Sequence, residues 1–155
     1  MIRKAEPGDV VAMIALAEAR RHQYQQYQPV FWRKAPDSAE KQSPFLTQQL
    51  SSERVIARVF EREGRIDGFV IGQLVPAPPV YAPGGPVLSV DDYCIASGTD
   101  WEATGRPLLE AVEAAARERG AVLTVVVCGH LDEPKRSMLR GQGFTIASEW
   151  YVRSL

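Results

Sequence analysis

Apolar residues recur every three or four positions in the first part of the chain, which is the spacing of one helix face. This pattern predicts a core-facing helix that begins after Asp9 and ends before Pro29, with a short strand over residues 2–5 ahead of it. Ser43 followed by proline is typical of a helix start, so a second, short helix is expected to reach about residue 51.

The pattern changes at Arg54, where β-branched and aromatic residues form short runs instead of a helical stripe. Residues 55–60 and 66–75 predict a hairpin with its turn at positions 63–64. A proline-rich loop follows, and residues 87–96 then predict a third strand. Together these strands would form an antiparallel meander.

The last third of the chain alternates between the two patterns. A helical stripe that stops at Gly120 is followed by the apolar run 121–128, which predicts a central strand covered by helices on both faces. Asp132 caps a final helix that reaches about Gln142, and residues 144–152 are expected to close the sheet.

The composition fits one globular domain over residues 1–155, with 45% hydrophobic and 24% charged residues. A net charge of -1 predicts no basic face, so no nucleic-acid partner is expected. No apolar run approaches the ~20 residues of a membrane span and no signal sequence is recognisable, so we expect a cytoplasmic protein without a membrane partner. Cys94 and Cys128 are expected to be reduced and packed, and no metal-ligand spacing is present.

The segment before Gly120 carries the clearest chemical signal. A strand ends near Ser97, a loop with small residues at Ala103 and Gly105 follows, and a long helix then begins. Free backbone amides and the positive end of a helix suit a phosphate or diphosphate. An ordinary strand-to-helix turn would favour the same small residues, so this motif alone leaves both interpretations open.

Three segments extend this signal: the hairpin 60–72, the helix start 105–109 and the Gly-Phe ending of residues 139–144. With them, the order of elements resembles the general N-acetyltransferase (GNAT) superfamily over nearly the whole chain. The resemblance implies an α/β, GNAT-like acyl-CoA N-acyltransferase fold. Its central mixed (α+β) sheet would have six to seven strands and about four flanking helices, and its cofactor would be acetyl-CoA.

The resemblance places the cofactor at the end of the third meander strand and on the following turn. In the family's diphosphate loop, Q/R-x-x-G-x-G/A, Asp100 stands here in place of a cation or amide, while Gly105 is kept. Asp100 should weaken phosphate binding, and Arg106 could compensate. The implied cofactor-binding residues are Ile95, Ala96, Ser97, Trp101, Ala103, Thr104, Gly105 and Arg106.

Acetylation of an amine needs a base that removes a proton from the amine. Asp91 and Asp92 are adjacent on a predicted strand and so point to opposite faces, which would turn one of them into the cleft. A solvated or arginine-paired carboxylate is the alternative. His130, at the expected rim of the cleft, could also carry a proton, or it could be an ordinary exposed loop residue.

The resemblance also implies a tyrosine acid in the last helix that protonates the departing thiolate. Leu139 occupies that position here. Tyr93 on the meander or Tyr151 near the C-terminus could take over this catalytic role, or each could be a packed aromatic residue.

The resemblance places the acceptor between the first helix pair and the facing loops, where Trp32 and Tyr81 could wall it and Arg33 could hold a carboxylate. We therefore expect an N-acetyltransferase acting on the primary amine of a small molecule or an N-terminus by direct attack. The alternatives are a catalytically weak GNAT-fold protein that binds CoA or another ligand as a sensor, and an interaction domain with a vacant cleft. A homodimer is left open.

Overall fold

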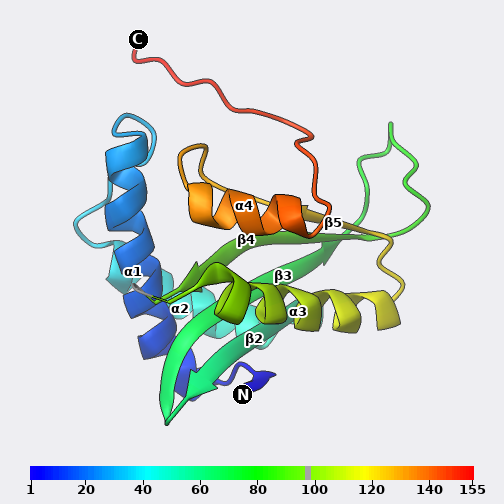
Figure 1. Ribbon diagram of the computed structural model, residues 1–155, viewed down its shortest axis with the longest axis horizontal. Helices are drawn as coiled ribbons and strands as arrows, with labels where there is room; N and C mark the ends of the chain where they lie inside the picture. The colour runs from blue at the N-terminus through cyan, green and yellow to red at the C-terminus, as the bar shows by residue number, and fades with distance from the viewer. Residues whose placement is uncertain (97–98) are drawn as a thin grey trace.

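The computed structural model describes residues 1–96 and 99–155. A mixed sheet of five strands forms its centre, in the order β1-β2-β3-β4-β5 (Figure 1). The elements are β1 (Ile2–Lys4), η1 (Pro7–Asp9), α1 (Val10–Tyr27), α2 (Ser38–Leu50), β2 (Val55–Arg62), β3 (Arg65–Val75), β4 (Val87–Ile95), η2 (Trp101–Gly105), α3 (Arg106–Glu118), β5 (Leu123–Val126) and α4 (Glu133–Gly141).

The meander is antiparallel from β1 to β4, as the alternating strand pattern predicts. Its tight hairpin between β2 and β3 needs left-handed backbone at both turn residues, and Glu63 and Gly64 have φ values of 52° and 75°. β5 joins β4 in parallel, but the pairing ends at Val90 and Val126. Beyond it the second half of β4 has no partner on that side within the described residues, so a wedge opens between the two strands.

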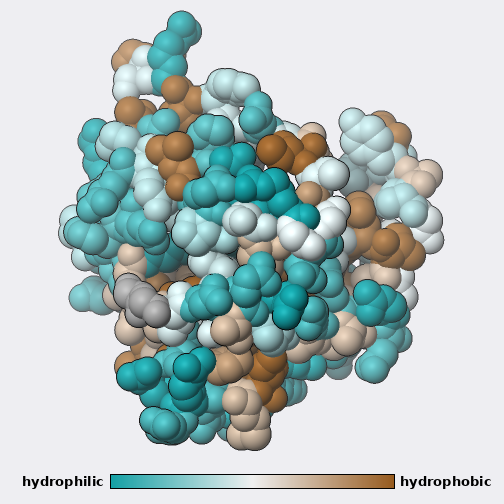
Figure 2. All heavy atoms as spheres, in the orientation of Figure 1, coloured by the Kyte–Doolittle hydropathy of each residue, from teal (hydrophilic) through white to brown (hydrophobic). Residues whose placement is uncertain are grey.

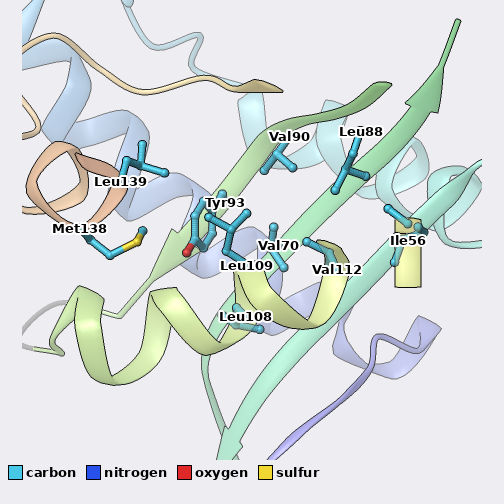
Figure 3. Packing of buried hydrophobic residues seen from close by; sticks show 11 residues of the cluster. Ile56, Val70, Leu88, Val90, Tyr93, Leu108, Leu109, Val112, Met138 and Leu139 are labelled. Atoms are coloured by element: carbon cyan, nitrogen blue, oxygen red, sulfur yellow. The ribbon is translucent and has the colours of Figure 1, made fainter. Parts of the chain in front are cut away.

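Helices cover both faces of the sheet. α1 and α2 lie on one face, where Met13, Leu46 and Phe69 are fully buried in one apolar cluster. α3 and α4 lie on the other face, where Leu109 and Met138 pack with strand residues in a second cluster (Figure 3). The helical periodicity of the sequence therefore predicts the correct core faces.

The second helix begins earlier than the sequence predicts. It starts at Ser38, and Pro44 lies inside it instead of at its first turn. The Ser38 hydroxyl donates to Glu18 on α1 at 2.6 Å, and Leu46 is fully buried against the sheet. Tertiary contacts therefore outweigh the local signal of the serine-proline pair.

The end of the chain differs most from the prediction. The run 121–128 is not a central strand: only Leu123–Val126 is regular, and it lies at the sheet edge. Residues 144–152 form no closing strand, so the sheet has five strands instead of six or seven. The outer side of β5 therefore pairs with no strand within the described residues, and β5 is the edge of the sheet.

The described residues contain neither a disulfide nor a metal-binding cluster. Both cysteines are free thiols; Cys94 is buried and Cys128 is half-buried. In the described ranges, no cluster of three or more His, Cys, Asp or Glu side chains could hold a metal ion. None of the described helices is both long and apolar enough to cross a membrane.

Candidate functional site

A cavity of about 670 Å³ opens where α1 and the α1–α2 connection face the free half of β4. Its walls include aromatic residues from the helical side and two carboxylate residues from β4. Gln42 also lines it, and the buried side-chain Oε1 of this glutamine has no hydrogen-bond partner among the described residues. An unpaired buried acceptor is costly, but protein atoms cover this one, so a ligand in the cavity would reach it only if the Gln42 side chain moved.

Asp92 is the half-buried carboxylate of this cavity, with 19% of its side chain exposed. Its Oδ1 lies 3.3 Å from the Nη2 of Arg20, whose Nη1 donates to the backbone carbonyl of Asp91 at 2.9 Å. Burial raises the pKa of Asp92, while the nearby Arg20 charge opposes the rise. A carboxylate with a raised pKa is a better proton acceptor than an exposed one, so Asp92 is suited to a general base. Asp91 also lines the cavity but is exposed.

Most cations around the cavity are already paired. Arg21 and Lys34 each contact Glu18 at 2.7 Å. Burial alone would raise the pKa of Glu18, but hydrogen bonds from Lys34, Ser38 and Arg21 lower it to about 2. Arg33 lines the cavity and forms no ion pair in the described part of the chain. Arg33 is therefore the cation best placed to bind an anionic group on a ligand.

The structure brings some sequence-predicted residues together and separates others. Trp32 and Arg33 line the cavity with Asp91 and Asp92, and the Trp32 ring packs on Tyr24 at 4.8 Å between centroids. Tyr81 lies on the proline-rich loop, 71% exposed, and does not line this cavity.

His130 lies on the loop before α4. It is exposed, does not line the cavity, and accepts a hydrogen bond from Arg136 through its backbone carbonyl at 2.8 Å. Nothing in this geometry brings its imidazole to Asp92. Its catalytic role therefore stays a prediction without geometric support.

Neither candidate tyrosine acid lines the cavity, and the buried Tyr93 hydroxyl has no hydrogen-bond partner among the described residues. Tyr93 is fully buried with its ring edge-on to Trp101 at 4.9 Å, and burial raises its pKa far above the usual range. It packs with Leu139 and Leu109 in the core (Figure 3). Tyr151 is 88% exposed and donates to Glu149.

Lys135 is the charged residue that the sequence analysis missed. It is fully buried on α4, and its Nζ donates to the carbonyls of Tyr93 at 3.3 Å and Val127 at 3.1 Å. These carbonyls lie on either side of the wedge between β4 and β5. Burial, reinforced by Arg20, lowers the pKa of Lys135 to about 8.

A sequence signal for Lys135 existed. Met138 and Leu139 mark the core-facing side of α4, and a residue three or four positions earlier lies on the same side. The Lys135 ammonium also lies over the rings of Tyr93 and Trp101, at 4.8 and 5.3 Å from their centroids. Carbonyl dipoles and ring faces therefore take the place of a carboxylate partner around this cation.

The η2 turn, which precedes α3, satisfies many of its own polar groups. The Asp100 carboxylate accepts from the Glu102 amide at 3.0 Å, and the Asp100 carbonyl accepts from the Thr104 amide at 2.9 Å. Arg106 lies 3.7 Å from Glu102 and 3.8 Å from Glu110. Arg106 was expected to compensate for the charge of Asp100, but its guanidinium already lies close to two carboxylates of the protein.

Other predicted cofactor residues lie along the same edge. Ile95 ends β4, and the amide of Ala96 donates to the Asp67 carbonyl at 2.8 Å. Ser97 lies outside the described residues. Gly105 is buried, and the site has no room for a side chain. A Cβ there would collide with the Trp101 ring and come within 3.1 Å of the Tyr93 hydroxyl oxygen.

No family model matches the chain, and no curated protein matches it in sequence. Solved structures do match it along nearly its full length. A mutant of a Bacillus halodurans protein has a TM-score of 0.86 at 14% identity, with 100% of this chain and 99% of that chain covered.

Two further matches are described as acetyltransferases. One is a predicted acetyltransferase from Clostridium acetobutylicum, solved with acetyl-CoA: TM-score 0.77, 15% identity, 99% of this chain and 95% of that chain covered. The other is ribosomal-protein-alanine N-acetyltransferase from Brucella melitensis biovar Abortus: TM-score 0.69, 18% identity, with 100% and 99% covered. The chain has the GNAT fold. The resemblance inferred from sequence is therefore confirmed for the fold.

The η2 turn fits the diphosphate of a CoA-type cofactor through its backbone. It leads directly into the 13-residue helix α3, with a positive helix end, and Ala103 is exposed without a bulky side chain. The Asp100 carboxylate opposes this fit because it adds negative charge and takes the Glu102 amide. The backbone of the η2 turn is thus suited to a diphosphate, and the charge of Asp100 opposes it.

Proposed function

We propose that the protein is an acetyl-CoA-dependent N-acetyltransferase that acts on the primary amine of a small molecule or an N-terminus by direct attack. One observation carries this proposal: the half-buried Asp92, with a raised pKa, lines a large cavity on the free half of β4. In a GNAT fold, this position supports a role for Asp92 as proton acceptor beside the wedge between β4 and β5.

The chain's own residues have separable tasks in this proposal. Asp92 removes a proton from the acceptor ammonium, and Arg20 holds the carboxylate in place. Trp32 packs against an apolar part of the acceptor, and Arg33 binds its anionic group. Acetyl-CoA, when bound, supplies the activated acetyl group, with its diphosphate held by the backbone of η2.

A second function, a sensor that binds CoA or another ligand without turnover, is supported by the η2 turn and by Leu139. Asp100 caps this turn, and the Arg106 guanidinium is shared between Glu102 and Glu110. The last helix also places Leu139 in the core where the family resemblance implies an acid. These features would lower cofactor affinity and slow thiolate departure.

Two measurements separate these functions. Calorimetric titration with CoA measures cofactor binding, and failure to bind at millimolar CoA would exclude both the enzyme and the CoA sensor. Release of free thiol from acetyl-CoA is then measured across a panel of amines with and without a carboxylate. We expect turnover with amines that carry a carboxylate. CoA binding without thiol release for any amine would favour the sensor.

A further inference from the structure

β5 presents a free, apolar edge to solvent. One side of the strand pairs with β4, and its other side pairs with no strand in the described ranges. Leu123, Val125 and Val127, at alternate positions, are 48%, 44% and 44% exposed. An unprotected edge strand with exposed β-branched side chains is a template for another strand.

The C-terminal segment 145–155 has complementary properties. Ile146, Trp150 and Val152 fall on one side of an extended chain, since side chains alternate, and Glu149 and Arg153 fall on the other. Ile146 is 68% exposed and Trp150 78% exposed. The segment therefore has the alternating pattern of a strand, but its backbone groups pair with no strand among the described residues.

The segment does not fold back onto the β5 of its own chain. The Phe144 amide donates to the Leu139 carbonyl, and no later residue forms a backbone hydrogen bond among those described. From there the segment crosses α4 toward the α1–α2 connection, where Trp150 meets Phe31 at 5.8 Å between ring centroids (Figure 1). Figure 2 shows brown, apolar side chains at the surface in the upper part of that view.

We propose that residues 145–152 of one copy add as a strand to the free edge of β5 in a second copy, and that the exchange is reciprocal. Each copy offers one free edge and one unpaired segment, so a twofold-symmetric pair satisfies both at once. Main-chain hydrogen bonds would provide affinity. The apolar side of the segment would cover Leu123 and Val125.

This interface would reach the acceptor cavity. Val127 follows β5 directly, lines the cavity and is exposed at its β5 side. A strand added along β5 would extend past this residue, so the partner would shield one wall of the cavity. The interface itself does not depend on the proposed catalytic function.

Two full-length variants test the exchange by complementation. The edge-blocked variant carries Leu123→Lys and Val125→Lys, and the segment-blocked variant carries Ile146→Lys and Trp150→Lys. All four side chains are substantially exposed, so both variants should fold, which circular dichroism melting checks. Association is measured by analytical ultracentrifugation at micromolar concentrations.

We expect the unaltered protein to dimerise and each variant alone to associate about a hundredfold more weakly. A mixture of the two variants should recover a one-to-one heterodimer, because one intact edge and one intact segment remain. Val11→Lys, on an α1 residue that is 81% exposed, is the matched control and should leave the dimer unchanged.

Three results would overturn the proposal. A monomeric unaltered protein would show that the exchange does not occur. Dimers of the edge-blocked variant would place the interface elsewhere, and dimers of the segment-blocked variant would show that segment 145–152 is dispensable. Recovery of a heterodimer only in the mixture is the outcome that neither edge-to-edge nor segment-to-segment pairing can produce.

Discussion

The acceptor cavity and the η2 turn both adjoin the free end of β4, yet they differ in whether their cations are already paired. The cavity holds a cation that a ligand could still pair with, Arg33, which forms no ion pair among the described residues. The η2 turn instead uses Asp100 and Arg106 for contacts within the protein. Under the proposed function, acceptor binding and cofactor binding would therefore depend on separate residues, which substitutions can test one at a time.

Asp92→Asn should have the largest effect, because it removes the proposed base while keeping the side-chain volume. We expect kcat with a carboxylate-bearing amine to fall at least about 100-fold. The rise of kcat/KM with pH that reflects Asp92 ionisation should also disappear. Because burial raises the pKa of Asp92, that rise in the unaltered protein should lie above the range of an ordinary carboxylate.

Asp91→Asn is the matched control for this substitution. It removes the same formal charge one residue away, from an exposed side chain at the cavity wall. We expect a much smaller loss of kcat and an unchanged pH profile. Equal losses in the two variants would mean that the cavity needs negative charge in general and no specific base.

Lys135 lies between the two regions, and its burial predicts a pH-dependent stability. The pKa is about 8 in the folded protein and 10.5 ordinarily, so the unfolded chain binds the proton more tightly. The free energy of unfolding should therefore rise between these two pH values, by about 3 kcal/mol. Lys135→Met should lack this rise, as measured by urea denaturation across that range.

The tyrosines set the upper limit of this pH experiment. Burial raises the pKa values of Tyr24 and Tyr93, so both stabilise the folded state less once the unfolded tyrosines ionise above about pH 10. The unaltered protein and Lys135→Met both contain these tyrosines, so the difference between their free energies of unfolding reports Lys135 alone. A rise that persists in Lys135→Met would assign the pH dependence to another group.

Gly105→Ala tests how tightly the cofactor turn is packed. A Cβ at this position would collide with the Trp101 ring, so we expect a loss of about 1–3 kcal/mol in the free energy of unfolding. Gly141→Ala is the control, since a Cβ there meets only a glutamate oxygen at 3.8 Å. If both variants were equally stable, the turn would have room to rearrange around a ligand.

The elements that sequence predicts well are those defined by local periodicity. The β2–β3 hairpin and the core faces of α1 and α3 follow from spacing alone. The position of β5 does not, because a buried run and an edge strand with one covered face share the same apolar composition. Pairing partners are non-local, and they decide whether the segment after α4 becomes a strand.

The candidate site shows the same division. Strand alternation predicts that Asp91 and Asp92 point to opposite faces, but only the fold shows that Asp92 is the more buried of the two. Tyr81 lies away from the cavity, 71% exposed on the proline-rich loop, whose path helix and strand periodicity does not specify. Lys135 was detectable from its place on the core side of α4, yet the carbonyls that receive it come from two distant segments.

Asp100→Asn should produce the smallest effect and the most direct comparison of the two regions. Asparagine can still cap the turn, so the fold should be kept, while the negative charge facing a diphosphate is removed. We expect CoA to bind about tenfold more tightly by calorimetry, which corresponds to about 1.4 kcal/mol. Glu118→Gln, at the far end of α3, removes the same charge and should not change the affinity. If CoA affinity were unchanged in Asp100→Asn, the Asp100 charge would not be what limits CoA affinity. The limit would then lie in the wedge between β4 and β5, because the Lys135 ammonium already occupies the carbonyls of Tyr93 and Val127 there.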